Sequence, residues 1–319
     1  MTLPAIFNTL QLPVIAAPMF ILSGKQMVIE QCKAGIVGSF PALNARGEGE
    51  FEQWLQDITE ELDRYNQANP DAPAAPFAVN QIVFKSNARL QEDMDLCVKY
   101  KVPIIITSLG ANEDVNSAAH SYGGIVMHDV INQRFAKKAI DKGADGLIAV
   151  ATGAGGHAGL LSPFALIQEI REWFDGPLAL SGCIATGDSV LAAQAMGADF
   201  AYIGSAFIAT KEANAESGYK QMVVDSYADD IVYSDYFTGV SGNYLKPSIK
   251  AAGMDPDNLP KGDIAAMNSL TDQASDAKAW KDIWGCGQGV GAVDEITTVT
   301  DRVNQIKQEY VAAKARLSL

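Results

Sequence analysis

The chain has 319 residues, of which 48% are hydrophobic and 19% charged, a balance that is ordinary for a globular enzyme. Its formal net charge of −14 disfavours nucleic acid and anionic membranes as main partners. The N-terminus has no basic segment followed by a long apolar run, and no apolar stretch reaches the roughly 18 residues that cross a bilayer, so we expect a soluble, cytoplasmic protein.

Short apolar runs alternate with longer helix-like runs over the first two thirds of the chain, which is typical of βα units around a parallel sheet. Most of the short runs are apolar throughout, as expected of strands that are buried on both faces. Eight strands are predicted, at residues 14–17, 36–40, 77–80, 104–107, 124–127, 146–150, 178–181 and 200–203.

Helical runs lie between these strands. Glycine follows two of them, at Gly143 and Gly197, where a helix would end. Eight βα units predict an α/β fold of the (β/α)₈ TIM-barrel type, with an open doubly wound sheet as the alternative. The predicted helices span residues 51–65, 88–100, 133–142, 163–174 and 189–196.

The pattern changes after about residue 215. We expect residues 1–215 to form the barrel and residues 216–291 to form a smaller, partly helical cap domain that carries substrate contacts. The final segment, 292–319, is helical and charged, and we expect it to return and pack on the barrel.

A glycine-rich loop at residues 151–159 follows the sixth predicted strand and presents a single histidine, His157. Glycine lets a ligand approach the backbone closely, so the loop is suited to hold one imidazole, beside Gly156, against a ligand. A mobile loop with an incidental histidine is the alternative. A dinucleotide-binding loop is disfavoured, because the glycines fit only a relaxed form of that motif and no acidic residue follows about 20 positions later.

Two further glycine loops follow the seventh and eighth strands, where TIM barrels often bind phosphate. The first contains Ser181, Gly182 and Cys183, and the second contains Gly204 and Ser205. Backbone N–H groups at such glycines can meet a phosphate oxygen, and Ser205 can begin a helix. The alternative is that both loops are merely tight turns. We favour a phosphate site, because both loops follow the two strands at which such a site is expected.

Other strand ends offer contacts to a flat ring. Ala17, Pro18 and Met19 end the first strand in a stiff apolar turn, and Asn80-Gln81 ends the third with two amides that can bond to the edge of a heterocycle. Core packing for Met19 and a turn role for Asn80 are the alternatives. A phosphate site, ring-edge amides, an apolar platform and one imidazole suit the flavin mononucleotide FMN.

The cysteines and histidines give no metal signature. The four cysteines form no CxxC pair and the three histidines are scattered, so we expect free thiols and no metal site. Neither Cys183 nor Cys286 has a neighbouring histidine in the sequence, which disfavours a nucleophilic thiol.

These motifs together resemble the nitronate monooxygenase family, and the resemblance covers nearly the whole chain. It rests on Ala17-Pro18-Met19, the histidine loop, Ser181 to Ile184, Gly204 to Thr210, and Gly287-Gln288-Gly289. It implies an FMN-dependent barrel with a smaller second domain, and oxidation of alkyl nitronates or nitroalkanes by O₂ to carbonyl compounds and nitrite.

The resemblance also implies roles for particular residues. His157 would be catalytic, orienting the nitronate or accepting a proton from a nitroalkane. The FMN would be bound by Ala17, Pro18, Met19, Asn80, His128, Gly156, Ser181, Gly182, Cys183, Gly204, Ser205 and Gln288.

Three departures from the family pattern are visible, and other reactions on the same scaffold stay open. Members often carry two glycines at Gly182-Cys183 and threonine at Ser205, and some carry lysine after a histidine where this chain has His128-Asp129. NAD(P)H-dependent quinone reductases and enoyl-acyl-carrier-protein reductases share these loops. A non-flavin phosphate-binding lyase or isomerase, a non-catalytic FMN-binding protein and a homodimeric assembly are further alternatives that the sequence leaves open.

Overall fold

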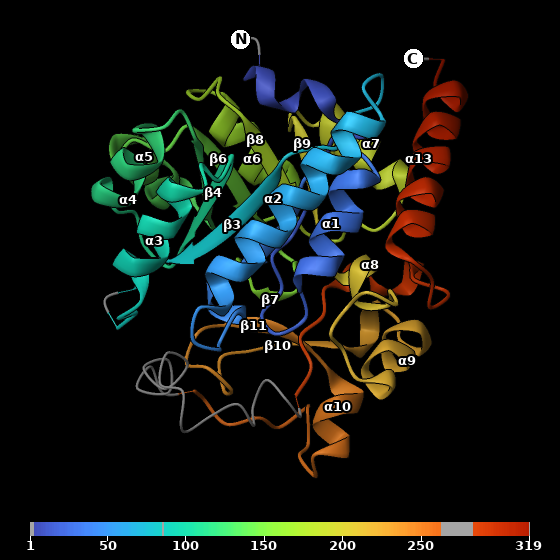
Figure 1. Ribbon diagram of the computed structural model, residues 1–319. Coiled ribbons are helices and arrows are strands. Elements are labelled where there is room, and N and C mark those ends of the chain that lie inside the picture. Colours follow the sequence, from blue (N-terminus) through green and yellow to red (C-terminus); the bar gives the residue numbers. More distant parts are fainter. Residues whose placement is uncertain (1–2, 85, 263–282, 319) are drawn as a thin grey trace.

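The computed structural model describes residues 3–84, 86–262 and 283–318 and confirms the TIM barrel (Figure 1). Eight parallel strands are hydrogen-bonded in the order β1-β9-β8-β6-β5-β4-β3-β2. The ring closes through a parallel bridge between Ile15 and Val37, where the Ala16 N–H donates to the Val37 carbonyl at 2.8 Å. The strands are β1 (Val14–Ala16), β2 (Gly38–Pro41), β3 (Phe77–Ile82), β4 (Ile104–Ser108), β5 (Ile125–Val130), β6 (Gly146–Val150), β8 (Leu178–Ser181) and β9 (Phe200–Ile203).

All eight predicted strands are present, and β5 differs most from its prediction. It continues to Val130 because it pairs with β6 as far as Val130↔Ala149. His128 and Asp129 therefore lie within a strand rather than in the loop that follows it.

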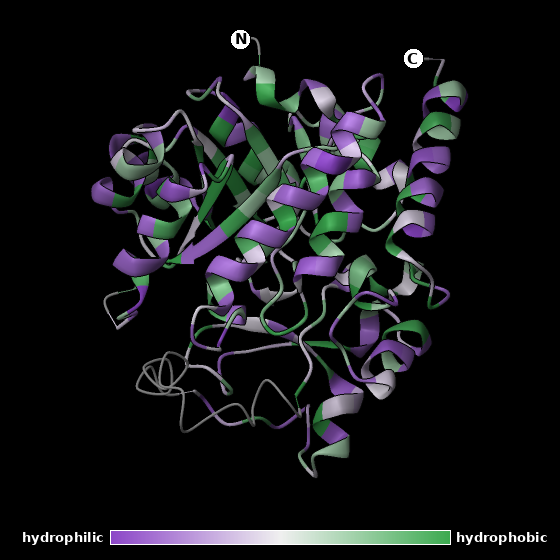
Figure 2. Ribbon diagram, viewed as in Figure 1, coloured by the Kyte–Doolittle hydropathy of each residue, from purple (hydrophilic) through white to green (hydrophobic). Residues whose placement is uncertain are grey.

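The helices cover the outside of the barrel, and each of the five predicted helices is present. Helix α2 (Glu50–Ala68) shows why: Phe51, Leu55, Ile58 and Leu62 are buried along one face, while its outward face is hydrophilic (Figure 2). The short helices α1 and α4 were not predicted. The surrounding helices are α1 (Lys25–Lys33), α2 (Glu50–Ala68), α3 (Leu90–Lys99), α4 (Glu113–His120), α5 (Gln133–Asp141), α6 (Pro163–Arg171), α7 (Gly187–Ala195) and α8 (Ser205–Ile208).

The barrel interior is filled from its amino-terminal end. Alternate strand residues such as Ile104, Ile148 and Phe200 form an inner apolar cluster that is separate from the cluster beneath the helices. The N-terminal 3₁₀ helix η1 (Ala5–Thr9) closes this end with Phe7, whose ring centre lies 4.6 Å from that of Phe200. The opposite end, where the strands finish, is left for a site.

A cap lies over the carboxyl end of the barrel, at the lower side of Figure 1. It contains α9 (Ser217–Asp225), β10 (Ile231–Ser234), β11 (Gly242–Leu245) and α10 (Lys246–Ala251). Its antiparallel sheet has the order β10-β11-β7, and β7 (Gly156–His157) comes from the histidine loop of the barrel. Part of the predicted cap, residues 263–282, lies outside the described residues.

The C-terminal helix α13 (Val299–Arg316) runs along the outside of the barrel beside α1 and α7 (Figure 1). Its Glu309 accepts a hydrogen bond from the Gly187 N–H at 2.8 Å, and its Tyr310 hydroxyl donates to Gln194 at 2.5 Å. Within the described residues, no helix combines the length and apolar character needed to cross a membrane.

Candidate functional site

A cavity of about 800 Å³ opens where the barrel strands end and the cap begins. Ligand sites in this fold lie at this face, and the volume falls within the usual range for ligand pockets. Twelve of the thirteen predicted site residues line it: Ala17, Pro18, Met19, Asn80, His128, Gly156, His157, Ser181, Gly182, Cys183, Gly204 and Ser205. The exception is Gln288, whose neighbours Gly287 and Gly289 line the cavity instead.

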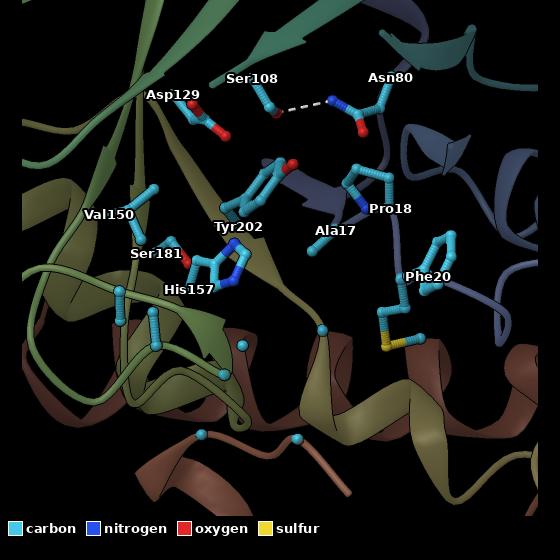
Figure 3. Close-up of a pocket in the computed structure, with 18 of the residues that line it drawn as sticks. Ala17, Pro18, Phe20, Asn80, Ser108, Asp129, Val150, His157, Ser181 and Tyr202 are labelled. Carbon is cyan, nitrogen blue, oxygen red and sulfur yellow. Dashed lines mark hydrogen bonds between the residues drawn. The ribbon is translucent and has the colours of Figure 1, made fainter. Parts of the chain in front are cut away.

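The turn after β1 is held in place by Asn44. The Asn44 amide donates to the carbonyls of Met19 and Ser23 at 3.0 and 2.8 Å, and its oxygen accepts from the Ile21 N–H at 2.8 Å. Ile21 has a φ of +67°, so these bonds stabilise a backbone that a branched residue rarely adopts. Met19 thereby joins Pro18, which is labelled in Figure 3, in a fixed apolar edge of the cavity.

The histidine loop is not the mobile loop that its glycines suggest. Gly156 and His157 form the strand β7, which pairs with β11 in the register Gly242↔His157. The buried Asn243 amide donates to the Ala154 carbonyl at 2.7 Å, and the Tyr233 hydroxyl donates to the Ala158 carbonyl at 2.9 Å. The cap therefore holds the loop on both sides of the histidine.

The His157 ring points into the cavity, below Tyr202 in Figure 3. Its Nε2 lies 3.0 Å from the Thr238 hydroxyl of the cap. Burial disfavours the charged form and lowers the pKa of His157 to about 4. At neutral pH the ring is thus an uncharged imidazole, which is able to accept a proton.

The loop after β8 has an unusual backbone. Gly182 has a φ of +138° and Cys183 a φ of +57°, so both lie outside the conformations that side chains favour. A Cβ on Gly182 would lie 2.8 Å from the Thr152 carbonyl, which is too close. Gly182 and Cys183 both line the cavity, so the backbone of this tight turn lies at the cavity edge, where the phosphate is predicted to bind.

Ser205 begins the short helix α8, as predicted, but its side chain is used by the protein itself. Its hydroxyl accepts a hydrogen bond from the Gly287 N–H at 2.9 Å and bonds to the buried Cys286 thiol. Nearby, the exposed Gln288 donates from its backbone N–H to the Gly153 carbonyl at 2.9 Å. Ser205 and Gln288 therefore join the C-terminal segment to the barrel loops, and contacts from Gly204 and Ser205 to a ligand would come from the backbone.

Three polar residues, Asp129, Ser108 and Asn80, line one side of the cavity, along the top of Figure 3. The buried Asn80 amide donates to the Ser108 hydroxyl at 2.7 Å, and Ser108 in turn bonds to the Asp129 carboxyl. Burial raises the pKa of Asp129 to about 6, although the Ser108 hydrogen bond opposes the shift. Asp129 thus places a carboxyl that titrates near neutral pH in a ligand cavity.

Two neighbours of these residues have other roles. Gln81 points to the opposite face of β3, as strand alternation requires, and its amide donates to the Cys97 sulfur at 3.4 Å. The paired-amide prediction is therefore wrong for Gln81. His128 touches the cavity but is 5% exposed, with its Nδ1 2.6 Å from the Thr107 hydroxyl. Burial and the nearby Lys138 charge lower the pKa of His128 to about 4.

Sequence reasoning missed three contributors to this site. Tyr202 lines the cavity two residues before Gly204, and its inward position could have been found from the alternation along β9. Thr238 contacts His157 from 81 residues away, and no sequence signal indicates it. Asp129 is visible in the sequence only as a departure from a familiar pattern. No three metal-ligating side chains gather within the described part of the chain.

Comparison with known proteins agrees with the sequence motifs. A family profile described as "Nitronate monooxygenase" matches residues 3–309. A protein named nitronate monooxygenase from Paraburkholderia phytofirmans is 24% identical over 285 residues, which cover 76% of each chain. The matches to two further curated relatives cover slightly less than two thirds of those proteins, 63% and 64%.

Solved structures share the fold at low identity. FabK from Thermotoga maritima superposes with a TM-score of 0.77 and 20% identity, over 100% of this chain and 99% of that one. A nitroalkane oxidase from Streptomyces ansochromogenes gives a TM-score of 0.76 and 21% identity, over 98% of this chain and 100% of that one.

Proposed function

The chain belongs to the nitronate monooxygenase family and is a flavin-dependent oxidoreductase; on that premise we propose that it binds FMN and oxidises alkyl nitronates, and neutral nitroalkanes, with O₂. The products are a carbonyl compound and nitrite. Family membership excludes the alternative of a non-flavin lyase or isomerase.

The observation that carries the proposal is that the His157 imidazole lines the same cavity as the two glycine loops predicted to bind phosphate. His157, Gly182 and Gly204 all line this cavity, although they come from three different βα loops. FMN needs one phosphate cradle and a wall for its ring, whereas a dinucleotide needs a second phosphate site. The loops at the carboxyl ends of β8 and β9 would form the single phosphate cradle that FMN needs.

The residues present fit FMN. Gly204 lines the cavity, and a Cβ there would lie 3.4 Å from the Ala17 Cβ and 3.7 Å from the Met19 sulfur, so this backbone lies directly beside the apolar turn after β1. The backbone N–H groups of residues 182–183 and 204–205 would hold the phosphate, with Met19 and Asn80 beside the ring. Bound FMN would supply the redox chemistry by taking electrons from the nitronate and delivering them to O₂.

The protein's own groups handle orientation and protons. The apolar turn at Pro18 and Met19 and the cap residue Val240 line the cavity, and they would limit the access of water to bound substrate. His157 accepts the proton that a neutral nitroalkane must lose: the C–H bond breaks, its electron pair stays on the nitronate, and the proton goes to the imidazole. A preformed nitronate needs only to be oriented by the ring.

The test compares His157→Ala with His120→Ala, since His120 is an exposed histidine paired with Asp145 at 2.8 Å. Both variants should bind FMN. His157→Ala should lose about 10²- to 10⁴-fold in turnover of a neutral nitroalkane, the usual contribution of a positioned base. The loss with a preformed nitronate should be smaller, and His120→Ala should match the wild type on both.

Anaerobic mixing separates the proposal from the reductase alternative. The bound flavin should be reduced by a nitronate and not by NADH, as followed by its absorbance. Reduction by NADH alone would contradict the proposed reaction, and purified protein that takes up no FMN would contradict the cofactor.

A further inference from the structure

Asn80, Ser108 and Asp129, here called the polar row, line the cavity near the carboxyl ends of β3, β4 and β5. In the closed ring of eight strands, β3 and β4 lie opposite β8 and β9, and β5 is next to β4. A ligand whose phosphate binds at the loops after β8 and β9, and whose body crosses the mouth of the barrel, therefore brings its far end to the polar row.

The Ile106 carbonyl fixes the orientation of the Asn80 amide. A carbonyl oxygen can only accept, so the Asn80 nitrogen, and not its oxygen, must be the atom that lies 3.2 Å from it. The same nitrogen donates to the Ser108 hydroxyl at 2.7 Å, which uses the second of its two N–H groups. The Asn80 oxygen points toward the open part of the cavity (Figure 3). Asn80 therefore offers the cavity an acceptor and no donor.

Ser108 continues the same direction of hydrogen bonding to Asp129. Its hydroxyl accepts from Asn80, so its single proton is available for the Asp129 carboxyl, to which it bonds. The Asp129 carboxyl points into the cavity beside Tyr202 (Figure 3), and an ionised carboxylate has only acceptors. The polar row thus presents acceptors at both of its ends, and it is complementary to a ligand edge that carries an N–H or O–H donor.

We propose that Asp129 is a cofactor-binding residue that accepts the N–H of the FMN ring, and that it thereby sets which edge of the ring faces β3, β4 and β5. The oxidised ring has a single N–H, at N3, on its polar edge. The inference rests on the FMN binding of the proposed function and does not depend on nitronate oxidation. Because Asp129 departs from the family pattern, family membership does not imply this contact.

The opposite orientation of the ring is disfavoured. It would place the apolar edge of FMN against the polar row and displace water from the Asp129 carboxylate and the Asn80 oxygen without offering a donor to either. A buried acceptor that loses its partner costs its full desolvation penalty, and the penalty is larger for a charged group. The ring N–H meets this requirement at Asp129.

The charge of Asp129 makes the contact depend on pH. Burial raises the pKa of Asp129 to about 6, so the carboxylate is the main form at about pH 8 and the protonated form at about pH 5. Hydrogen bonds to an ionised group are roughly twice as strong as those between neutral groups. The affinity for FMN should therefore decrease as the pH falls through 6.

The other titratable groups of the cavity do not reproduce this change. Burial lowers the pKa of both histidines to about 4 and raises the pKa values of the tyrosines and the cysteine. Any titration of the lysine, the glutamate or the FMN phosphate is common to wild type and an Asp129 variant, so a ratio of affinities removes it. These groups are His128, Lys138, His157, Cys183, Tyr202, Glu216 and Tyr219.

The first measurement compares the dissociation constants of FMN and N3-methyl-FMN for the FMN-free protein at about pH 8, followed by flavin fluorescence. Wild type should bind the methylated flavin about 10- to 100-fold more weakly, because a hydrogen bond to a charged group is lost. Asp129→Ala removes the carboxylate and leaves room for the methyl group, so it should bind the two flavins within about threefold of each other. Equal binding of the two flavins by wild type, or an unchanged preference in Asp129→Ala, would overturn the proposal.

The second measurement follows FMN affinity with pH in wild type and Asp129→Asn. The affinity of wild type divided by that of Asp129→Asn should fall about 10-fold between about pH 8 and about pH 5. The matched control is Asp141→Asn, at the exposed end of α5, which should equal wild type at both pH values. If Asp129→Asn fails to fold, the wild-type comparison of the two flavins still decides.

The outcomes separate this inference from the proposed cofactor. FMN that binds with an Asp129 ratio that is constant with pH would overturn the role of Asp129 and leave FMN as the cofactor. A wild-type protein that takes up no FMN would overturn both.

Discussion

Replacing Cys183 by glycine should leave the folded protein more stable than replacing it by alanine. Cys183 has a φ of +57°, a left-handed conformation that costs a residue with a Cβ about 1–2 kcal/mol. Glycine escapes that cost but loses about 0.4–1 kcal/mol more than alanine because its unfolded chain is freer. The balance favours glycine by about 1 kcal/mol.

The thiol contributes little that would obscure this comparison. Its contacts are the Thr152 carbonyl at 3.8 Å and the Gln288 amide oxygen at 3.7 Å, both at the long limit for sulfur. Either variant loses both contacts, so the difference between the variants reports the backbone conformation. Because the predicted phosphate contact is made by backbone N–H groups, Cys183→Gly should also retain FMN.

The assay is urea unfolding of the FMN-free variants, with flavin affinity measured separately. As a matched control, Gln56→Ala and Gln56→Gly on the exposed face of α2 should show the opposite order, with alanine more stable by about 1 kcal/mol. An alanine variant at position 183 that equals or exceeds the glycine variant would refute the strained backbone. Loss of FMN in Cys183→Gly would show that the thiol itself is needed.

Three more outcomes follow from the same cavity. Gly204→Val should keep the fold but lose FMN, because a Cβ just fits beside Ala17 and Met19 and the extra methyl groups of valine would crowd the part of the cavity that Gly204 lines; full flavin occupancy would contradict that placement. Gly153→Ala should destabilise the protein, since its Cβ would lie 2.2 Å from the Cys183 sulfur. In a double-mutant cycle, Cys183→Gly should recover part of this loss of stability. Strictly additive effects of the two substitutions would argue against the contact. Asp129 has a folded-state pKa of about 6, above the value near 4 of an unfolded chain, so its protonated form favours folding below pH 4 and that contribution is lost as pH rises through 6. The unfolding midpoint of the wild type minus that of Asp129→Asn should fall as the pH rises from 4 to 6. A difference that stays constant over this range would count against the raised pKa.

Most of the fold could be predicted from the sequence, because strands buried on both faces must be apolar throughout. Helix α4 was missed because it has no such apolar signal. It is short and mostly polar, and its clearest signal is the Asn112 side chain that accepts from the Asp114 N–H at its start. Helices of this kind form because the barrel packs one side of them, which single-residue patterns do not reveal.

The part of the site that could be predicted is the part that follows from the barrel topology. Parallel strands bring their carboxyl ends to one face, so Met19, Asn80 and Gly204 had to meet once the barrel was recognised. Gln81 did not, because neighbouring residues of a strand face opposite ways. Gln288 did not either, because it begins the 3₁₀ helix η4 (Gln288–Ala292), in which Gly289 lines the cavity and Gln288 is exposed.

The packing around His157 shows why the rest of the site could not be predicted. Four glycines in its loop suggested mobility, but in the folded protein they allow close packing between distant segments. A Cβ on Gly155 would lie 2.8 Å from the Gly287 nitrogen, so the loop and the C-terminal segment could not approach as they do. Glycine at this spacing is equally consistent with motion and with tight packing, and only the position of the cap distinguishes them. Because the cap contacts His157 through Thr238, the same glycines that permit this packing allow a residue 81 positions away to reach the imidazole.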